Sequence, residues 1–167
     1  MTLRLIIGCD PGQTGALALL ADGESDGFID MPTVARRAGG QQVDGVTLAN
    51  QVREALARHA GADVLAVLEL VSAMPKQGSS SGFRFGQSDG VLRGVLGALR
   101  VPLIEVPPQM WKRHLRLTGC DKDAARTLAI QRFPNAAPRL ARKKDIGRAD
   151  AILLALWGAK TECWLGE

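Results

Sequence analysis

The sequence predicts a single α/β domain over residues 1–167, built on a mixed five-stranded sheet with helices on its faces. Two observations carry this prediction. Apolar stretches of strand length, separated by turn residues, fill the first 31 residues, and helical and strand patterns alternate after them. A chain of 167 residues with 46% hydrophobic residues suits one domain with one substantial core.

The N-terminal part predicts a meander of three strands. Residues 3–9 are an apolar run rich in Leu and Ile, and the turn sequence Asp10-Pro11-Gly12 ends it. Residues 16–21 form a second apolar strand, and a turn follows toward a third strand near residues 27–31. Asp10 is therefore expected at the tip of the first strand.

The next stretch predicts a loop and then an amphipathic helix. Residues 36–45 are polar and rich in glycine, which is typical of a loop. Apolar residues recur at helical spacing at Leu48, Val52 and Leu56, with Thr47 as the expected N-cap and Gly61 near the end.

The second half predicts alternating strands and helices. Residues 64–71 are apolar except for Glu69, as in a strand covered on both faces, and residues 103–106 form a further strand. A glycine- and serine-rich loop is expected at residues 75–82. Helical patterns occupy residues 87–100, 110–117, 121–133 and 148–160.

Cysteine content and hydropathy argue against several protein classes. The three cysteines Cys9, Cys120 and Cys163 are far apart, without the spacing of a zinc site or a disulfide framework. Neither a run of eighteen apolar residues nor a signal-peptide cleavage site is present. We therefore expect a cytosolic protein, in a bacterium or a phage-infected host, with no membrane partner.

Positive charge is concentrated in one segment of the chain. The whole chain has a formal charge of +4, whereas residues 107–148 alone carry eleven basic and three acidic side chains. Such segregation favours a polyanionic partner, because each phosphate contact releases counterions. A solvated basic surface remains an alternative. The basic residues of this segment are Lys112, Arg113, Arg116, Lys122, Arg126, Arg132, Arg139, Arg142, Lys143, Lys144 and Arg148.

Three acidic residues stand at unusual places in this layout. Asp10 ends the first strand, Glu69 ends an otherwise apolar strand, and Asp150 lies at the start of an apolar helix. If the two strands are neighbours and the last helix packs over them, the carboxylates converge at one edge of the sheet. Each also has a plainer role available: Asp10 in the turn, Glu69 facing solvent, and Asp150 at the positive end of its helix.

Convergent carboxylates indicate a divalent-metal site. Buried carboxylates repel one another, and hard cations such as Mg²⁺ or Mn²⁺ neutralise them with oxygen ligands. Two such ions activate water and stabilise the leaving oxygen in phosphodiester hydrolysis. Other catalytic groups are scarce, because the chain has only His59 and His114, no tyrosine, and no G-x-S-x-G motif.

The residues around these carboxylates resemble the RuvC-type Holliday junction resolvases over nearly the whole chain. The resemblance lies in G-C-D-P-G-Q-T-G-A-L-A around Asp10, in Leu68-Glu69, in F-G-Q-S-D-G at residues 85–90, and in G-R-A-D-A-I-L-L-A at residues 147–155. It implies a ribonuclease H-like fold and a metal-dependent endonuclease that resolves Holliday junctions and related branched DNA. Asp10, Glu69 and Asp150 would be metal ligands, with two ions in each active site.

The resemblance also assigns roles to basic residues. Lysines that contact DNA and aid catalysis in the family correspond to Lys112 and Lys122. Trp111-Lys112 after paired prolines, together with G-R-A-D-A, is more similar to phage-borne resolvases than to the main bacterial type.

Two positions depart from the family pattern. A fourth acidic or histidine ligand precedes the last aspartate by three residues in many relatives, and here that position is Gly147. Asp145 is the nearest candidate for a fourth ligand, and a helix N-cap is its alternative role. The aromatic wedge that relatives carry shortly after Glu69 is absent, and Met74 or Phe83 are the candidate substitutes. Phe83 and Phe85 could equally be core residues, and we favour that interpretation for Phe85.

The resemblance further implies a two-fold homodimer on four-way branched DNA, without a nucleotide cofactor. Gly90, Gly94 and Gly97 punctuate the 87–100 helix and permit close packing, either against a second copy or within the chain. The predicted DNA-contacting residues are Met74, Lys76, Phe83, Arg84, Lys112, Arg113, Lys122, Arg142, Lys143, Lys144 and Arg148.

Three other functions share parts of this pattern. A ribonuclease H-like nuclease acting on structured RNA or flaps would have the same fold and ligands. A junction-binding module without cleavage would share the basic surface. The D-P-G-Q-T-G turn also resembles the phosphate loop of actin-like ATPases and sugar kinases, which normally need two such domains.

Overall fold

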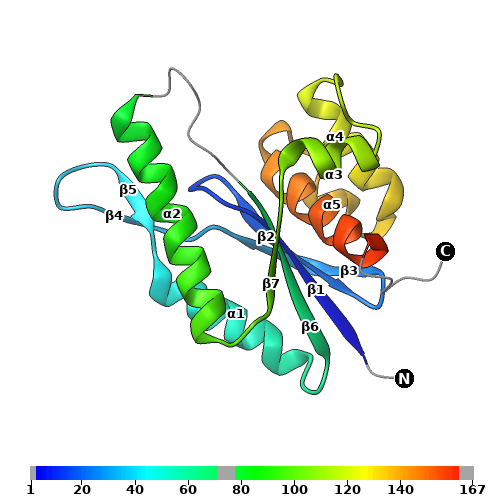
Figure 1. The fold of residues 1–167 in the computed structure, drawn as a ribbon, viewed down its shortest axis with the longest axis horizontal. Coiled ribbons are helices and arrows are strands. Elements are labelled where there is room, and N and C mark those ends of the chain that lie inside the picture. The colour runs from blue at the N-terminus through cyan, green and yellow to red at the C-terminus, as the bar shows by residue number, and fades with distance from the viewer. Residues whose placement is uncertain (1–2, 71–77, 162–167) are drawn as a thin grey trace.

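A computed structural model of the chain describes residues 3–70 and 78–161, except for the side chains of Ser79 and Lys122. It confirms the predicted mixed sheet of five strands, in the order β3-β2-β1-β6-β7 (Figure 1). The strands are β1 (Arg4–Asp10), β2 (Ala16–Ala21), β3 (Glu24–Asp30), β6 (Asp63–Glu69) and β7 (Leu103–Val106).

Strand direction brings two of the predicted acidic residues to the same edge of the sheet. β1 is antiparallel to β2 and parallel to β6, with Cys9 opposite Leu68. Asp10 and Glu69 are the last residues of these neighbouring parallel strands. Because neighbouring parallel strands end at the same edge of the sheet, Asp10 and Glu69 occupy adjacent positions at that edge.

Helices cover both faces of the sheet (Figure 1). α5 (Ile146–Thr161) packs on β1 and β2, with α3 (Pro108–His114) and α4 (Lys122–Arg132) on the same side. α1 (Gly45–Arg58) and α2 (Ser79–Ala98) cover the other face. Alternation along β1 supplies both layers, because Ile6 faces α5 while Leu5 and Ile7 face the other layer.

The backbone of α5 touches the central strand of the sheet. A Cβ placed on Gly8 would stand 1.8 Å from the Ala151 carbonyl oxygen and 2.6 Å from the Ala155 nitrogen. Only glycine permits this approach, since any side chain at residue 8 would overlap the helix backbone. The contact fixes α5 over the end of β1. Ala151, which makes this contact, directly follows Asp150 in the sequence.

Two local predictions about the 33–47 stretch were wrong. A short hairpin, β4 (Thr33–Ala35) with β5 (Gln41–Val43), occupies part of the region predicted as a loop, and Gly39 and Gly40 turn it with positive φ. The N-cap of α1 is Asp44 rather than Thr47, because the Asp44 carboxylate accepts hydrogen bonds from two backbone N–H groups and from the Thr47 hydroxyl.

Three helices, α2, α3 and α5, begin earlier than predicted, α3 at Pro108 instead of residue 110. α2 begins at Ser79 instead of residue 87, and the fully buried Leu92 and Leu96 anchor it against the sheet. Its glycine- and serine-rich first turns are helical despite their low helix propensity. α5 begins at Ile146 instead of residue 148, after 3-10 turns at Pro134–Arg139 and Lys143–Asp145 that the sequence pattern did not reveal.

The described cysteines are free thiols. Cys9 is buried in β1, where burial raises the pKa of its thiol, whereas Cys120 is exposed. Cys163 lies outside the described residues. None of the helices in the described part of the chain is both long enough and apolar enough to pass through a bilayer.

Candidate active site

Three carboxylates from separate parts of the chain gather where β1 and β6 end. Asp10 closes β1, Glu69 closes β6, and Asp150 lies on α5, which crosses β1 at Gly8. Glu69 is one of the few buried charged residues, with 8% of its surface exposed. We call Asp10, Glu69 and Asp150 the acidic cluster.

The pKa values of the acidic cluster show that its carboxylates repel one another. Burial raises the pKa of Asp10, and the charges of Asp150 and Glu69 raise it further. Burial also raises the pKa of Glu69, and Asp150 adds to that effect. The pKa of Asp150 rises to about 6, with burial as the cause.

Lys112 is the cation that faces this cluster. Its charge lowers the pKa of Asp10, Glu69 and Asp150, so its ammonium group lies close to all three. The neighbouring Trp111 of α3 is fully buried, and the Lys112 Nζ lies 5.2 Å from its indole centroid. The buried indole N–H also lowers the pKa of Glu69, although it does not reach full hydrogen-bond geometry.

The acidic cluster has the charge that a divalent cation requires. Three carboxylates face one ammonium group, and burial and mutual repulsion disfavour their ionised forms. Hard divalent cations relieve both costs by supplying positive charge to oxygen ligands. Across residues 3–70 and 78–161, no group of three Asp, Glu, His or Cys side chains is arranged as a ready-made metal site.

Asp145 is paired with two arginines rather than with members of the acidic cluster. It accepts hydrogen bonds from the Arg142 guanidinium at 2.8 Å and from the Arg142 backbone N–H, and Arg148 lies 3.7 Å away. These groups cover the carboxylate, leaving 4% of the residue exposed, and the hydrogen bond from Arg142 lowers its pKa. The alternative of a helix N-cap is not what the structure shows, because Asp145 is the third residue of the 3-10 turn that Arg142 caps, and its carboxylate accepts from the Arg142 backbone N–H.

Position 147, next to the acidic cluster, has no room for a side chain. A Cβ at this position would stand 2.7 Å from the Thr14 carbonyl oxygen and 3.1 Å from the Asp10 carboxylate. The 11–15 loop therefore packs directly on the first turn of α5. Because Gly147 has no side chain, the backbone of α5 lies next to the Asp10 carboxylate at this point.

Part of the predicted basic surface is used inside the protein. Arg126 binds Asp123 and the carbonyl of Leu140, and Arg148 binds both oxygens of Asp30 and the carbonyl of Arg139. The Arg148 side chain is only 13% exposed. We therefore remove Arg148 from the predicted DNA-contacting set, because its guanidinium is occupied by these partners.

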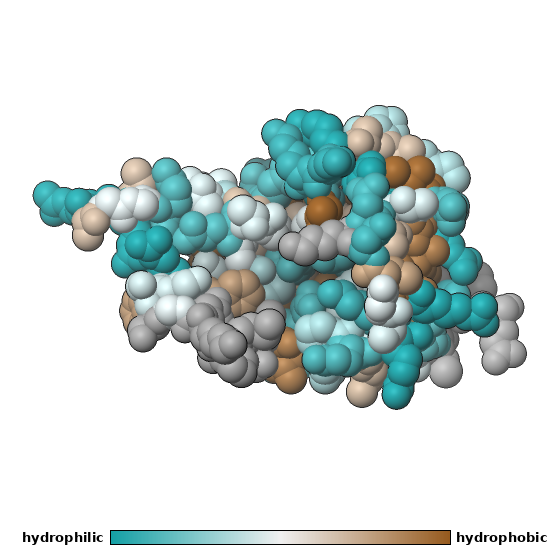
Figure 2. All heavy atoms as spheres, turned by 90° about the horizontal axis from the view of Figure 1, so that it is seen from above, coloured by the Kyte–Doolittle hydropathy of each residue, from teal (hydrophilic) through white to brown (hydrophobic). Residues whose placement is uncertain are grey.

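Other basic residues of the segment remain on the surface. Figure 2 shows hydrophilic side chains on both halves of this face, interspersed with hydrophobic ones over the half that holds α3–α5, and the β4–β5 hairpin projecting from the other half. A polar pocket of about 270 Å³ between the 11–15 loop and the turn before α5 includes Lys144 and Arg142. The exposed basic residues are Arg113, Arg116, Arg132, Arg139, Arg142, Lys143 and Lys144.

The remaining predicted residues fall into two groups. Met74 and Lys76 lie outside the described residues, and of Lys122 only the backbone, at the start of α4, is described. Phe83 is 68% exposed and Arg84 is exposed, which leaves both available to a partner. Phe85 belongs to neither core cluster; its ring covers Gly12 and lines a small pocket. Our preference for a core role of Phe85 was therefore wrong.

Sequence reasoning missed two residues that shape this region. Trp111 supports Lys112, and a tryptophan adjoining a predicted functional lysine was a usable signal. Gln13 follows Asp10 within the quoted D-P-G-Q-T-G motif, and its side-chain amide donates a hydrogen bond to the Gln41 carbonyl at 2.8 Å. The motif could have drawn attention to Gln13. Its hydrogen-bond partner Gln41 could not have been found, because it lies in the β4–β5 hairpin, which was not predicted.

Comparison with known proteins supports the predicted fold. No protein-family model matches the chain. A stretch of 91 residues is 35% identical to the chloroplastic Holliday junction resolvase MOC1 of Chlamydomonas reinhardtii, covering 54% of this chain and 10% of that protein. The chain thus spans about a tenth of the length of the curated relative it matches.

Two solved structures resemble the chain over nearly its whole length. T. thermophilus RuvC in complex with Holliday junction substrate superposes with a TM-score of 0.56 and 17% identity, covering 96% of each chain. A second Thermus thermophilus RuvC structure gives a TM-score of 0.55 and 15% identity, covering 95% of this chain and 97% of that one. The chain therefore has the RuvC form of the ribonuclease H-like fold.

Proposed function

We propose that the protein is a metal-dependent endonuclease that resolves Holliday junctions and related branched DNA. The gathering of Asp10, Glu69 and Asp150 around Lys112 is the observation that carries the proposal. The RuvC fold and the similarity to a chloroplastic Holliday junction resolvase support the same substrate. Neither observation alone fixes the reaction, since one fold supports many functions.

The acidic cluster would hold Mg²⁺ or Mn²⁺, with two ions in each active site. Bound there, such ions supply a nucleophilic water and charge stabilisation at the leaving oxygen. Asp10, Glu69 and Asp150 would be the ligands, because their raised pKa values identify them as carboxylates short of positive charge. Asp145, our candidate fourth ligand, would instead hold Arg142 in place through its hydrogen bonds.

The chain's own cations would position the DNA. Lys112 would contact the phosphate next to the acidic cluster, and Lys122, at the start of α4, would approach the same strand. Exposed Arg113, Lys143 and Lys144 would hold flanking phosphates without reading sequence. Phe83, at 68% exposure, is the described candidate for an apolar wedge at the junction centre.

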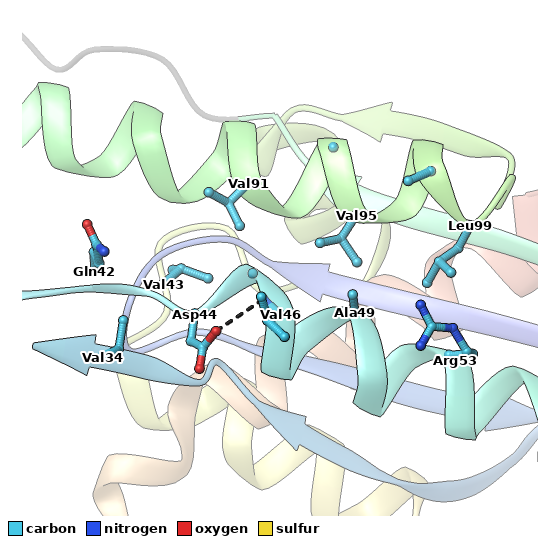
Figure 3. Close-up of a pocket in the computed structure, with 13 residues that line it drawn as sticks. Val34, Gln42, Val43, Asp44, Val46, Ala49, Arg53, Val91, Val95 and Leu99 are labelled. Carbon is cyan, nitrogen blue, oxygen red and sulfur yellow. Dashed lines mark hydrogen bonds between the residues drawn. The ribbon is translucent and has the colours of Figure 1, made fainter.

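A homodimer would place two such sites on opposite strands of the junction. Support comes from an apolar groove of about 520 Å³ between α1, α2 and the β4–β5 hairpin (Figure 3). Val46 and Val34 border it with 74% and 44% exposure. In the described chain nothing lies within 4 Å of a Cβ built on Gly90, Gly94 or Gly97, so these glycines are not explained by internal packing. Sedimentation of Val46→Asp against wild type tests this face, with a shift to monomer expected.

Cleavage and binding measured side by side test the proposal. Wild-type protein with Mg²⁺ is incubated with four-way junction, flap, duplex and structured RNA substrates. We expect junction cleavage by wild type, and Asp10→Asn is expected to lose at least about a hundredfold in rate while keeping junction affinity, since it removes a metal ligand and no phosphate contact. The matched control Asp63→Asn, exposed at the opposite end of β6, is expected to cut like wild type.

Each other outcome points to a specific alternative. Cleavage of RNA or flaps in preference to junctions would identify a ribonuclease H-like nuclease with another substrate. Tight junction binding with no metal-dependent cleavage would identify a binding module. Equal loss of binding and cleavage in Asp10→Asn would contradict the role of Asp10 as a metal ligand.

A further inference from the structure

We infer that a small pocket beside the acidic cluster receives one base of the DNA strand that is cut, and that Gln13 and Arg84 read that base. The inference rests on the proposed junction cleavage and adds a source of sequence preference to it. The pocket has a volume of about 200 Å³ and is lined by Gln13, Ser81, Arg84, Phe85 and Ser88.

The position of the pocket ties it to the strand at the acidic cluster. Gln13 belongs to the 11–15 loop, which leaves the end of β1 directly after Asp10. The other four residues belong to the first half of α2, on the far side of the pocket. A nucleotide next to a phosphate bound at Asp10 would therefore lie close to both walls of the pocket, the one formed by Gln13 and the one formed by α2.

Gln13 is held in an orientation suited to recognition. Its amide N–H donates to the Gln41 carbonyl of β5 at 2.8 Å, which fixes the plane of the side chain. An amide held through its nitrogen presents its carbonyl oxygen as an acceptor. The exocyclic amino groups of adenine and cytosine are donors that fit such an acceptor, and glutamine is one of the side chains that read adenine.

Arg84 and Phe85 supply the remaining elements of a base site. Arg84 is exposed and carries a planar guanidinium that can donate to base or phosphate oxygens. The ring of Phe85 covers Gly12, where a Cβ would stand 3.1 Å from it, so the ring is tied to the same loop as Gln13. The buried Ser88 hydroxyl donates to the Arg84 carbonyl at 3.1 Å and steadies this turn of α2.

The combination of groups favours a base over a phosphate alone. A phosphate needs cations, whereas this pocket joins one guanidinium to an oriented amide and an aromatic ring, on which a base can stack. Its volume of about 200 Å³ is also below the range of about 300–1,000 Å³ typical of pockets for whole small molecules. A single base projecting from a distorted strand is a ligand of suitable size and chemistry.

A library of four-way junctions with random bases around the crossover tests the inference. Sequencing the cut ends gives the preference of each variant at each position. We expect wild type to favour one base next to the cut by about tenfold or more, and Gln13→Ala to reduce that ratio to about threefold or less. Arg84→Lys keeps the charge but loses the planar fork, so it is also expected to flatten the preference. Gln87→Ala, an exposed glutamine of α2 that does not line the pocket, is expected to keep the wild-type ratio.

The outcomes separate this inference from the proposed function. Junction cleavage by wild type without any base preference, or an unchanged ratio in both Gln13→Ala and Arg84→Lys, would overturn the base pocket and leave junction cleavage standing. A uniform loss of cutting on every sequence would identify a phosphate clamp instead, which also overturns base reading. No junction cleavage by wild type would overturn the proposed function and this inference together.

Discussion

Replacing Asp150 with asparagine is expected to stabilise the metal-free protein and to reduce strongly its stabilisation by Mg²⁺. Burial raises the pKa of Asp150 from 3.8 to about 6. At about 1.4 kcal/mol for each pH unit, this difference makes the ionised carboxylate cost about 3 kcal/mol in the folded state above pH 6. Asparagine removes the charge, so Asp150→Asn is expected to raise the free energy of unfolding by about 1–3 kcal/mol at pH 8.

The sign of the pH dependence follows from the raised pKa. Between pH 3.8 and about 6 the folded protein holds the Asp150 proton more tightly than the unfolded chain does. The stability that this group contributes is therefore present below pH 4 and is lost as the pH rises to about 6. Subtracting the Asp150→Asn profile from the wild-type profile isolates this group from the other carboxylates.

Urea unfolding in EDTA and in Mg²⁺ measures both effects. Mg²⁺ at a hundred times its dissociation constant would add about 2.7 kcal/mol to the wild type and much less to the variant. The control Asp63→Asn, at an exposed position of β6, is expected to follow the wild type in both buffers. A variant less stable than wild type at pH 8 in EDTA, or parallel pH profiles, would refute the account of a strained carboxylate cluster.

Two further predictions concern packing and DNA binding. Gly8→Ala is expected to cost about 3 kcal/mol or more in thermal or urea unfolding, because its Cβ would overlap the Ala151 carbonyl at 1.8 Å, whereas Gly86→Ala, with open space around it, should be neutral or slightly stabilising. A change near zero in Gly8→Ala would contradict the contact between β1 and α5. Changing Lys143 and Lys144 together to alanine is expected to weaken junction binding and to reduce the slope of log affinity against log salt by about 2, as measured by fluorescence anisotropy across a salt series. An unchanged slope would remove both lysines from the DNA surface.

The strands of the sheet were predictable because their apolar runs are nearly continuous. Residues 3–9 and 64–71 became β1 (Arg4–Asp10) and β6 (Asp63–Glu69), and the strand at residues 103–106 was confirmed as β7. The β4–β5 hairpin escaped prediction because each of its strands has three residues and few apolar positions. The early start of α2 escaped because its glycine- and serine-rich first turns have low helix propensity, and the buried Leu92 and Leu96 lie further along the helix.

The acidic cluster was predictable in composition but not in detail. Asp10 and Glu69 could be placed because each ends an apolar strand, and parallel neighbours share an edge. The position of Asp145 could not be inferred, because it depends on Arg142 and Arg148, and Arg148 is fixed by Asp30, 118 residues away. Contacts of that sequence separation leave no local pattern, so the pairing of Arg148 with Asp30 could not be predicted either.

Crystals grown with Mn²⁺ would test the central claim most directly, because anomalous scattering locates the ion without reference to activity. The account predicts an anomalous peak bounded by carboxylate oxygens of Asp10, Glu69 and Asp150, and no peak in crystals of Asp10→Asn. Mn²⁺ bound at Asp145 and Asp30, or a fully loaded crystal with no peak at the ends of β1 and β6, would contradict it.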